Sequence, residues 1–308
     1  MRDLADPVSA LDAALRDGRF VLTAELTSPP GADAASVRRR ARLLRGHVLA
    51  ANVPDGQAVS AHMAPLAAAR LLLDEGLEPV PTLQCRDRNR LALQSDLIGA
   101  ASLGVANVLC LTGDAPAAGS PVPPVFDLDS VGLLCAASGL MAGRFLDGGR
   151  LRSPPRLLLG AAGHPFAQSR QQRIERLGEK AAAGARFVQT QYVFDVPGFA
   201  AWLRDVRAAG LDRELAIIAS TGPLRSPRVL TFVRRLPGVR IPEAIERRLA
   251  GLDDEAFAQE SLAICAETAA ALAALPGVAG VHLLAPYWEQ RIPEIIAAAG
   301  LAGRSARA

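Results

Sequence analysis

The sequence has almost no lysine. Of its 34 lysine and arginine residues, 33 are arginine, and Lys180 is the only lysine. The 31 acidic residues leave a formal net charge of +3, so the chain has no strong overall field that would attract nucleic acid. A local basic run, Arg38-Arg39-Arg40, lies in a helical stretch, and we interpret it as a solvated helix face. A bias of this strength indicates the base composition of the genome, not a function. Lys180 is the exception to it.

Cysteine is also scarce, and its spacing matches no common metal or redox motif. The four cysteines are Cys85, Cys110, Cys135 and Cys265. They form no CxxC pair and no Cys/His ligand pattern, so we expect neither a metal site nor a disulfide framework. The sequence instead predicts isolated buried thiols in a reducing cytosol.

Long apolar runs are absent as well. No stretch approaches the ~20 uninterrupted apolar residues of a membrane span. The segment Met1–Phe20 carries charges throughout and lacks the apolar core of a signal peptide. With 50% hydrophobic and 21% charged residues, the composition is far from that of a disordered chain. The sequence therefore predicts a soluble, cytoplasmic protein that does not associate with membranes.

Short apolar runs alternate with longer helical patterns along the chain. The runs of strand length are Phe20–Leu26, His47–Val53, Glu78–Gln84, Asn107–Leu111, Arg156–Ala162, Phe187–Phe194, Leu215–Ser220 and Gly280–Ala285. Their continuous apolar character is typical of strands covered on both faces. The segments of helix length are Asp33–Arg45, Ala64–Glu75, Arg88–Leu103, Leu128–Met141, Gln168–Ala183, Gly198–Ala209, Ser226–Leu236, Pro242–Ala250, Glu255–Leu275 and Trp288–Ala299.

This alternation predicts an α/β fold, a single (β/α)8 TIM barrel that occupies residues 1–308 as one domain. Residues 1–18 would form an N-terminal extension or helix, and residues 288–308 a C-terminal helix and tail. A doubly wound sheet is the main alternative, and it would place a glycine-rich phosphate turn after the first strand. The chain has Glu25-Leu26-Thr27-Ser28-Pro29-Pro30 there and contains no GxGxxG. The segment Gly113–Pro124 is interpreted as a long active-site loop after the fourth strand.

Polar residues gather where the predicted strands end, which is the face that carries ligand chemistry in such barrels. They are Glu25, Asp55, Cys85-Arg86-Asp87-Arg88-Asn89, Thr112-Gly113-Asp114, His164, Gln191 and Thr221. Removing polar groups from water costs free energy, so a set of this size at the ends of apolar strands points to a functional site.

Each of these residues also has a structural interpretation. Glu25 follows an apolar strand, where a carboxyl group should have a raised pKa and could act as a general acid, or it could pair with an arginine such as Arg86. Asp114 could bind a ligand or cap its own loop. His164 could be a structural loop histidine. Lys180 could lie on a solvated helix face or capture a phosphate.

Taken in order, these motifs resemble the methylenetetrahydrofolate reductase family, and most closely its bacterial branch also found fused to homocysteine methyltransferase domains. The resemblance covers Phe20 to about Leu301. Its motifs are Ala24-Glu25-Leu26 with Pro29-Pro30, Asn52-Val53-Pro54-Asp55-Gly56, Cys85-Arg86-Asp87-Arg88-Asn89, Gln94-Ser95-Asp96, Leu111-Thr112-Gly113-Asp114, Phe126-Asp127-Leu128-Asp129-Ser130-Val131, Lys180 through Gly184-Ala185, Thr190-Gln191 and Ile241-Pro242-Glu243.

The resemblance implies an α/β barrel that holds FAD and uses NAD(P)H as hydride donor. Reduced flavin would convert 5,10-methylenetetrahydrofolate to 5-methyltetrahydrofolate, in the one-carbon metabolism that serves methionine synthesis. The implied partners are tetrahydrofolate derivatives, further copies of the chain in a homo-oligomer, and a partner methyltransferase.

The resemblance also assigns roles to individual residues. Glu25 matches the general acid that helps open the imidazolidine ring, and Asp114 matches a second catalytic carboxylate near flavin and pterin. The implied substrate-binding residues are Gln191, Asp114 and Glu25. The implied cofactor-binding residues are Asp55, Thr112, Gly113, Asp114, His164 and Lys180.

The chain departs from the family pattern at several flavin or folate contacts. Thr112 stands where a large branch has arginine, and Arg173 stands where a carboxylate is common. Ala161-Ala162 replaces a tyrosine-proline pair before Gly163-His164. These departures keep two alternatives open: a tetrahydrofolate-dependent methyltransferase or demethylase without flavin, and a non-catalytic folate-binding subunit. In the second, the helix at Trp288 would dock a partner enzyme instead of capping the barrel.

Overall fold

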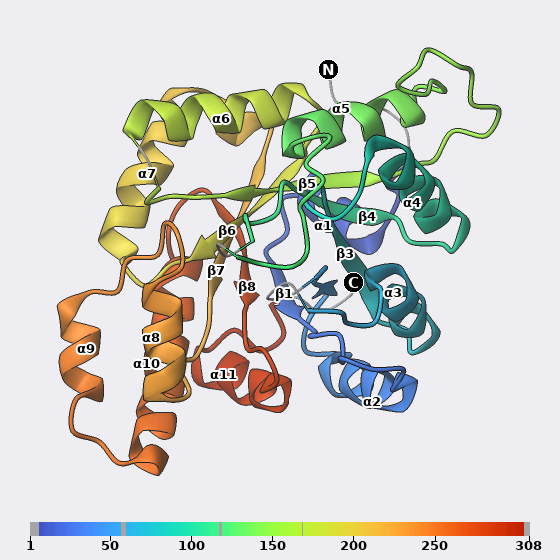
Figure 1. The fold of residues 1–308 in the computed structure, drawn as a ribbon. Coiled ribbons are helices and arrows are strands. Elements are labelled where there is room, and N and C mark those ends of the chain that lie inside the picture. The colour runs from blue at the N-terminus through green and yellow to red at the C-terminus, as the bar shows by residue number, and fades with distance from the viewer. Residues whose placement is uncertain (1–5, 57–59, 117–118, 168, 305–308) are drawn as a thin grey trace.

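The computed structural model describes residues 6–56, 60–116, 119–167 and 169–304. Within these residues, eight parallel strands form a closed barrel in sequence order, and β8 closes onto β1 (Figure 1). The strands are β1 (Val21–Glu25), β2 (Ala50–Val53), β3 (Glu78–Gln84), β4 (Asn107–Leu111), β5 (Leu158–Gly163), β6 (Phe187–Tyr192), β7 (Ala216–Thr221) and β8 (Val278–Leu283). The predicted (β/α)8 barrel is confirmed, and the doubly wound alternative, an open sheet, is excluded.

Helices follow the strands and surround the barrel (Figure 1). They are α1 (Ala10–Arg16), α2 (Ala34–Leu44), α3 (Pro65–Asp74), α4 (Arg90–Ser102), α5 (Ser130–Met141), α6 (Arg170–Ala182), α7 (Val196–Ala208), α8 (Pro227–Arg234), α9 (Glu243–Leu249), α10 (Asp254–Ala273) and α11 (Ile292–Ala298), with short 3-10 turns η2 (Leu211–Arg213) and η3 (Glu289–Arg291). The helix predicted from Trp288 thus begins as η3. Gln168, the predicted start of α6, lies outside the described residues.

The second predicted strand begins three residues later than expected. The apolar run from His47 enters β2 only at Ala50, because the amides of His47 and Val48 both donate to the carbonyl of Leu44 and close a turn after α2. Apolar character alone does not distinguish such a turn from the strand after it.

Helix α1 closes the amino-terminal end of the barrel. Leu11 and Ala14 form one buried cluster with residues from the amino-terminal halves of the strands: Val21, Ala50, Val80, Leu109, Leu158, Phe187 and Ile218. The carboxylate of Glu78 accepts hydrogen bonds from the first amides of α1, at Ala10 (2.8 Å) and Leu11 (3.0 Å). A negative charge at a helix N-terminus is stabilising, so Glu78 fixes α1 beneath the barrel. The predicted N-terminal helix is therefore present, and ligands must enter from the opposite end.

Above this apolar floor, the barrel interior is polar. Asn52 on β2 and Gln189 on β6 pair through their amide groups, and strands this far apart can meet only across the interior. Gln189 also donates to Thr23 at 3.5 Å, and Thr23 shares a hydrogen bond of 2.8 Å with Nδ1 of His282. Burial lowers the pKa of His282 to about 3, so this imidazole is neutral at physiological pH. Buried amides are stable only when paired, and this network pairs them.

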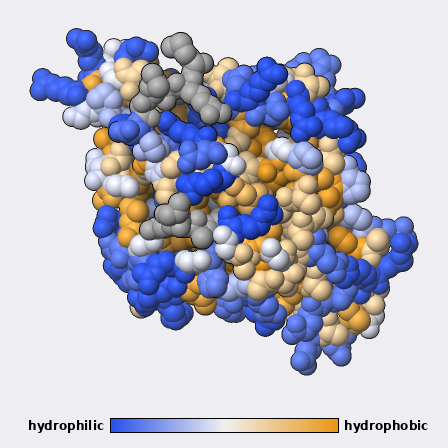
Figure 2. Space-filling model, turned by 180° about the vertical axis from the view of Figure 1, so that it is seen from behind, coloured by the Kyte–Doolittle hydropathy of each residue, from blue (hydrophilic) through white to orange (hydrophobic). Residues whose placement is uncertain are grey.

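On the face seen in Figure 2, hydrophilic side chains gather toward the periphery and apolar surface extends across the middle. Three cysteines, Cys85, Cys110 and Cys265, are buried as predicted. The prediction is wrong for Cys135, which is exposed because it lies on the outward side of α5. None of the helices in the described ranges is both long enough and apolar enough to cross a membrane.

Candidate active site

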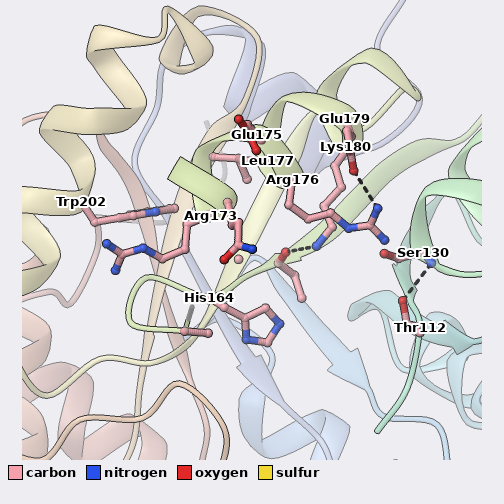
Figure 3. Close-up of a pocket in the computed structure, with 14 residues that line it drawn as sticks. Thr112, Ser130, His164, Arg173, Glu175, Arg176, Leu177, Glu179, Lys180 and Trp202 are labelled. Atoms are coloured by element: carbon pink, nitrogen blue, oxygen red, sulfur yellow. Dashed lines mark hydrogen bonds and ion pairs between the residues drawn. The ribbon is translucent and has the colours of Figure 1, made fainter. Parts of the chain in front are cut away.

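A cavity of about 450 Å³ opens beside the carboxyl ends of β4 and β5, beneath helix α6. Its lining includes Thr112, Ser130, His164, Arg173, Arg176 and Lys180. Figure 3 shows three of the basic side chains of α6, Arg173, Arg176 and Lys180, at the cavity, with His164 at its other side in the loop after β5. Two predicted cofactor residues far apart in the sequence, Thr112 and Lys180, are therefore brought together with a third, His164.

Helix α6 presents its basic residues by regular spacing. It begins with a capping box, in which the Ser169 hydroxyl accepts from the amide of Gln172 while the Gln172 side chain accepts from the amide of Ser169. Arg173, Arg176 and Lys180 come next at intervals of three and four residues, which places them on one helix face. That face covers the cavity.

Lys180 is buried, not solvated. Its side chain is only 7% exposed, and Nζ donates a hydrogen bond of 2.7 Å to the carbonyl of Ala162 on β5. The interpretation of this lysine as part of a solvated helix face is therefore wrong. Phosphate capture, the functional interpretation, stays a prediction.

The cavity is electrostatically unusual. Loss of water around Lys180, together with the charge of Arg176, lowers the pKa of Lys180 to about 8. Desolvation and the nearby Lys180 charge lower the pKa of His164 below its usual range. Arg176 is ion-paired with Asp129 and Glu179. At neutral pH the cavity thus holds a largely protonated lysine beside a neutral histidine.

Two buried nitrogens of the cavity wall have no partner among the described residues, Nε of Arg173 and Nε1 of Trp202. Nη1 of Arg173 donates a hydrogen bond to the carbonyl of Pro165. Unpaired buried donors are costly, and they are commonly completed by a ligand or by water. The cavity wall therefore offers unused hydrogen-bond donors to an anion.

The turn after β4 is built around Gly113. Its φ of +87° is in the left-handed region, and a Cβ there would lie 2.7 Å from Oε1 of Gln84 and 2.9 Å from Cβ of Arg86. Only glycine fits this position. Thr112 accepts from the amide of Ser130 at 2.9 Å, which ties the end of β4 to α5. Asp114 is exposed beyond this turn, and its charge acts on His164.

Asp55 lies apart from the cavity in an ion network. It is ion-paired with Arg88 and also accepts from the amide of Gln84 at 3.2 Å, and its side chain is 6% exposed. Arg86, which the sequence offered as a partner for Glu25, instead pairs with Asp87 and donates to the carbonyl of Gly56 at 2.8 Å. These contacts join the loops after β2 and β3, and the cofactor-binding role of Asp55 stays a prediction.

Glu25 ends β1 at the mouth of the barrel. It lies two residues beyond Thr23 on the same strand face, and alternate residues of a strand share a face, so its side chain belongs to the interior. Desolvation, and secondly the charge of Glu289, raise the pKa of Glu25 to about 7. A carboxyl group with this pKa can hold and release a proton near neutral pH, as a general acid must.

The end of β6 lies near Glu25. Burial and the charge of Glu25 both raise the pKa of Tyr192, whose hydroxyl donates to the carbonyl of Leu284 at 3.4 Å. Gln191 is partly buried, and its side-chain oxygen accepts from the amide of Tyr192 at 2.9 Å. Gln191 therefore stands on the strand whose end approaches the candidate acid.

Sequence reasoning missed several residues of the site. The sequence contains a signal for Arg176, because residues four positions apart lie on the same helix face and Arg176 stands four positions before Lys180. Glu289 had none, since it is near the other end of the chain from Glu25. The interpretation of Arg38-Arg39-Arg40 as a solvated face is wrong for Arg40, whose side chain is 15% exposed and ion-paired with Glu289 at 3.0 Å.

Comparison with known proteins gives one family. The model of the family described as methylenetetrahydrofolate reductase matches residues 10–300. Methylenetetrahydrofolate reductase 1 of Schizosaccharomyces pombe is 28% identical over 227 residues, which cover 71% of this chain and 35% of that protein. Probable methylenetetrahydrofolate reductase (NADPH) of Caenorhabditis elegans is 26% identical over 241 residues, 76% of this chain and 34% of that protein. The chain thus spans about a third of the length of these relatives.

Solved structures agree on the fold. An uncharacterized protein from Clostridium thermocellum that binds two copies of 5-methyl-5,6,7,8-tetrahydrofolic acid superposes with a TM-score of 0.67 at 14% identity, covering 95% of this chain and 99% of that one. Tryptophan synthase from M. tuberculosis superposes with a TM-score of 0.55, also at 14% identity, covering 98% and 99%. At such identities the likeness concerns the barrel alone.

Proposed function

We propose, from the premise that this chain belongs to the methylenetetrahydrofolate reductase family, that it reduces 5,10-methylenetetrahydrofolate to 5-methyltetrahydrofolate with FAD and NAD(P)H. The observation that carries the proposal is Glu25, a carboxyl group with a pKa of about 7 at the mouth of the barrel. The Clostridium thermocellum neighbour, which binds a methylated tetrahydrofolate, supports a folate as substrate.

Glu25 acts as the general acid. It donates its proton to a nitrogen of the imidazolidine ring, and the ring opens with positive charge on the methylene carbon. Asp114 supplies negative charge that stabilises this cation, and Gln191 holds the folate by hydrogen bonds from the end of β6. Glu25 must be protonated before the step, which its raised pKa allows at neutral pH.

The cavity beneath α6 fits the diphosphate of FAD. Lys180 supplies a buried charge, and Arg173 and Trp202 supply buried nitrogens that lack partners in the described part of the chain. Fixed donors of this kind, two of them cationic, recognise phosphate oxygens. Thr112, Gly113 and His164 would border the flavin, whereas Asp55 would act through the loop that it orders. When bound, the flavin would supply hydride transfer from NAD(P)H to the folate.

The test begins with the visible absorbance of the purified full-length protein, before and after incubation with FAD. We expect a flavin spectrum that NADH or NADPH bleaches and that methylenetetrahydrofolate restores. Glu25→Gln should abolish the second step and leave the first, because the proton is needed only by the folate. Glu294→Gln, at an exposed position of α11, is the matched control. A protein that binds FAD but shows the same folate turnover in Glu25→Gln would contradict the assignment of the acid.

A second candidate is a tetrahydrofolate-dependent methyltransferase or demethylase that does not use flavin. The observation that favours it is Ala162, which lines the cavity as part of the Ala161-Ala162 pair that replaces the tyrosine-proline pair of the family. A colourless protein that FAD does not reconstitute, together with methyl transfer from 5-methyltetrahydrofolate and no NAD(P)H oxidation, would support this candidate. NAD(P)H oxidation by a colourless protein would instead indicate a flavin-independent reductase.

The remaining expectations belong to the same proposal. We place the reaction in one-carbon metabolism leading to methionine, in the cytoplasm, in a homo-oligomer that serves a partner methyltransferase. Sedimentation of the purified protein tests the oligomer. The rates of flavin reduction by NADH and by NADPH identify the preferred hydride donor.

A further inference from the structure

Glu289 is a buried carboxylate that the proposed reaction does not use. It lies in η3, after β8, and is only 1% exposed. Its Oε1 accepts hydrogen bonds from the backbone amide of Thr27 and from Nη1 of Arg40, both at 3.0 Å. A buried carboxylate is costly unless it is paired and hydrogen-bonded, and these two contacts from distant segments meet that need.

These contacts place Glu289 against the candidate acid. Thr27 is two residues after Glu25, so the hydrogen bond from its amide fixes the segment that carries the acid. The charge of Glu289 also reaches Glu25 and disfavours a second negative charge there. The carboxylate therefore acts on both the position and the proton of Glu25.

Other groups around Glu25 bear on the same proton. Tyr192 faces it from β6 and is neutral, because burial raises its pKa. His282 on β8 is neutral too, with its pKa lowered to about 3. Arg40 on α2 pairs with Glu289 and partly offsets its charge. Glu289 is thus the negative group that opposes ionisation of Glu25 in this set.

We propose that Glu289 is a positioning residue for the acid step: it fixes the segment after β1 and keeps Glu25 protonated until the folate takes the proton. This inference rests on the proposed function, because only in that reaction does Glu25 deliver a proton to the folate. Arg40 stabilises the negative charge of Glu289 through their ion pair at the rim of the barrel.

The central test is Glu289→Gln in the full-length protein. The amide oxygen of glutamine still accepts from the amide of Thr27, so the variant removes the charge and preserves the contact. Titration of side-chain carboxyl carbons by ¹³C NMR monitors Glu25 without any substrate, and the signal is assigned by its loss in Glu25→Gln. We expect the pKa of Glu25 to fall in Glu289→Gln, while Glu294→Gln, a carboxylate of the neighbouring α11, leaves it unchanged. An unchanged Glu25 titration in Glu289→Gln overturns the proposal.

The reaction supplies an independent readout. In Glu289→Gln the alkaline limb of the pH profile of folate reduction should move to lower pH, because above its pKa a carboxyl group loses about tenfold in protonated fraction per pH unit. The rate at pH above 7 falls several-fold, and the rate at lower pH is kept. Equal loss at every pH would indicate a merely structural role and overturn the proposal.

A second variant keeps the inference testable should Glu289→Gln fail to fold. In Arg40→Gln the charge of Glu289 is no longer offset, so the pKa of Glu25 should rise, opposite to the first variant. A fall, or no change, contradicts the proposal. The NMR titration needs no turnover, so it separates failure of this inference from failure of the proposed function. If only the proposed function fails, Glu25 will show its raised pKa and the expected shifts in the variants, but the protein will be inactive on folate.

Discussion

The ammonium group of Lys180, on helix α6, donates a hydrogen bond of 2.7 Å to the carbonyl oxygen of Ala162, on strand β5. This contact draws the single lysine of the chain away from solvent and into the wall of a cavity (Figure 3). Burial and the charge of Arg176 disfavour the charged form of Lys180 more than the nearby carboxylates of Asp129 and Glu179 stabilise it, so the pKa of Lys180 is lowered to about 8. The arrangement is therefore prepared for an anion.

Lys180→Met should weaken the binding of FAD by about tenfold or more. Methionine preserves the length and apolar stem of lysine but removes the charge, and a hydrogen bond to a charged group contributes about 1.5–3 kcal/mol. Isothermal titration of FAD into the purified protein measures the change. Arg204→Met, at an exposed position of α7, removes a charge outside the cavity and should bind FAD as the unmodified protein does.

The same binding should depend on pH. Because the pKa of Lys180 in the free protein is about 8, well below 10.5, the ammonium is lost as the pH rises through 8, and FAD affinity falls with it. This decline should be absent from Lys180→Met, which has no ammonium to lose. A variant with unchanged affinity and unchanged pH dependence would mean that Lys180 only braces α6 against β5.

Glu25→Gln should stabilise the protein above pH 7. The pKa of Glu25 is about 7 in the folded state and 4.5 for an ordinary glutamate, so the folded state binds more protons between these values and loses stability as the pH rises through them. Glutamine removes this penalty, and we expect a gain of about 1–3 kcal/mol at pH 8 that vanishes at pH 4. Urea unfolding at both pH values measures it. Equal stability at pH 8 would show that Glu25 titrates normally.

The barrel could be predicted from the sequence because its signal is repeated. Eight apolar runs separated by helical segments repeat the same strand–helix unit. An error at one predicted boundary, such as the strand start at His47, therefore does not change the predicted fold. The strand ends are then fixed by the fold, and Glu25, Thr112 and His164 could be placed at the mouth by position alone. Features that depend on local spacing could therefore be predicted.

The contacts that determine the chemistry could not be predicted in this way. In the sequence, Lys180 and Arg40 both lie in arginine-rich segments that resemble solvated helix faces. Lys180 is buried because α6 packs on β5, and Arg40 because α2 packs on η3. Glu289 acts on Glu25 across nearly the whole chain, and no periodicity records that approach. The pairing of Asn52 with Gln189 likewise depends on closure of the barrel.

That pairing gives a test of the polar interior. Asn52→Leu leaves the Gln189 amide without its main partner in the described part of the interior, and an unsatisfied buried group costs about 1–3 kcal/mol. The double variant Asn52→Leu with Gln189→Leu removes both polar groups, so it should regain most of that loss. Urea unfolding of the two single variants and the double variant gives the coupling free energy. If the double variant loses the sum of the two single losses, the amides do not depend on each other, and the interior is held by packing alone.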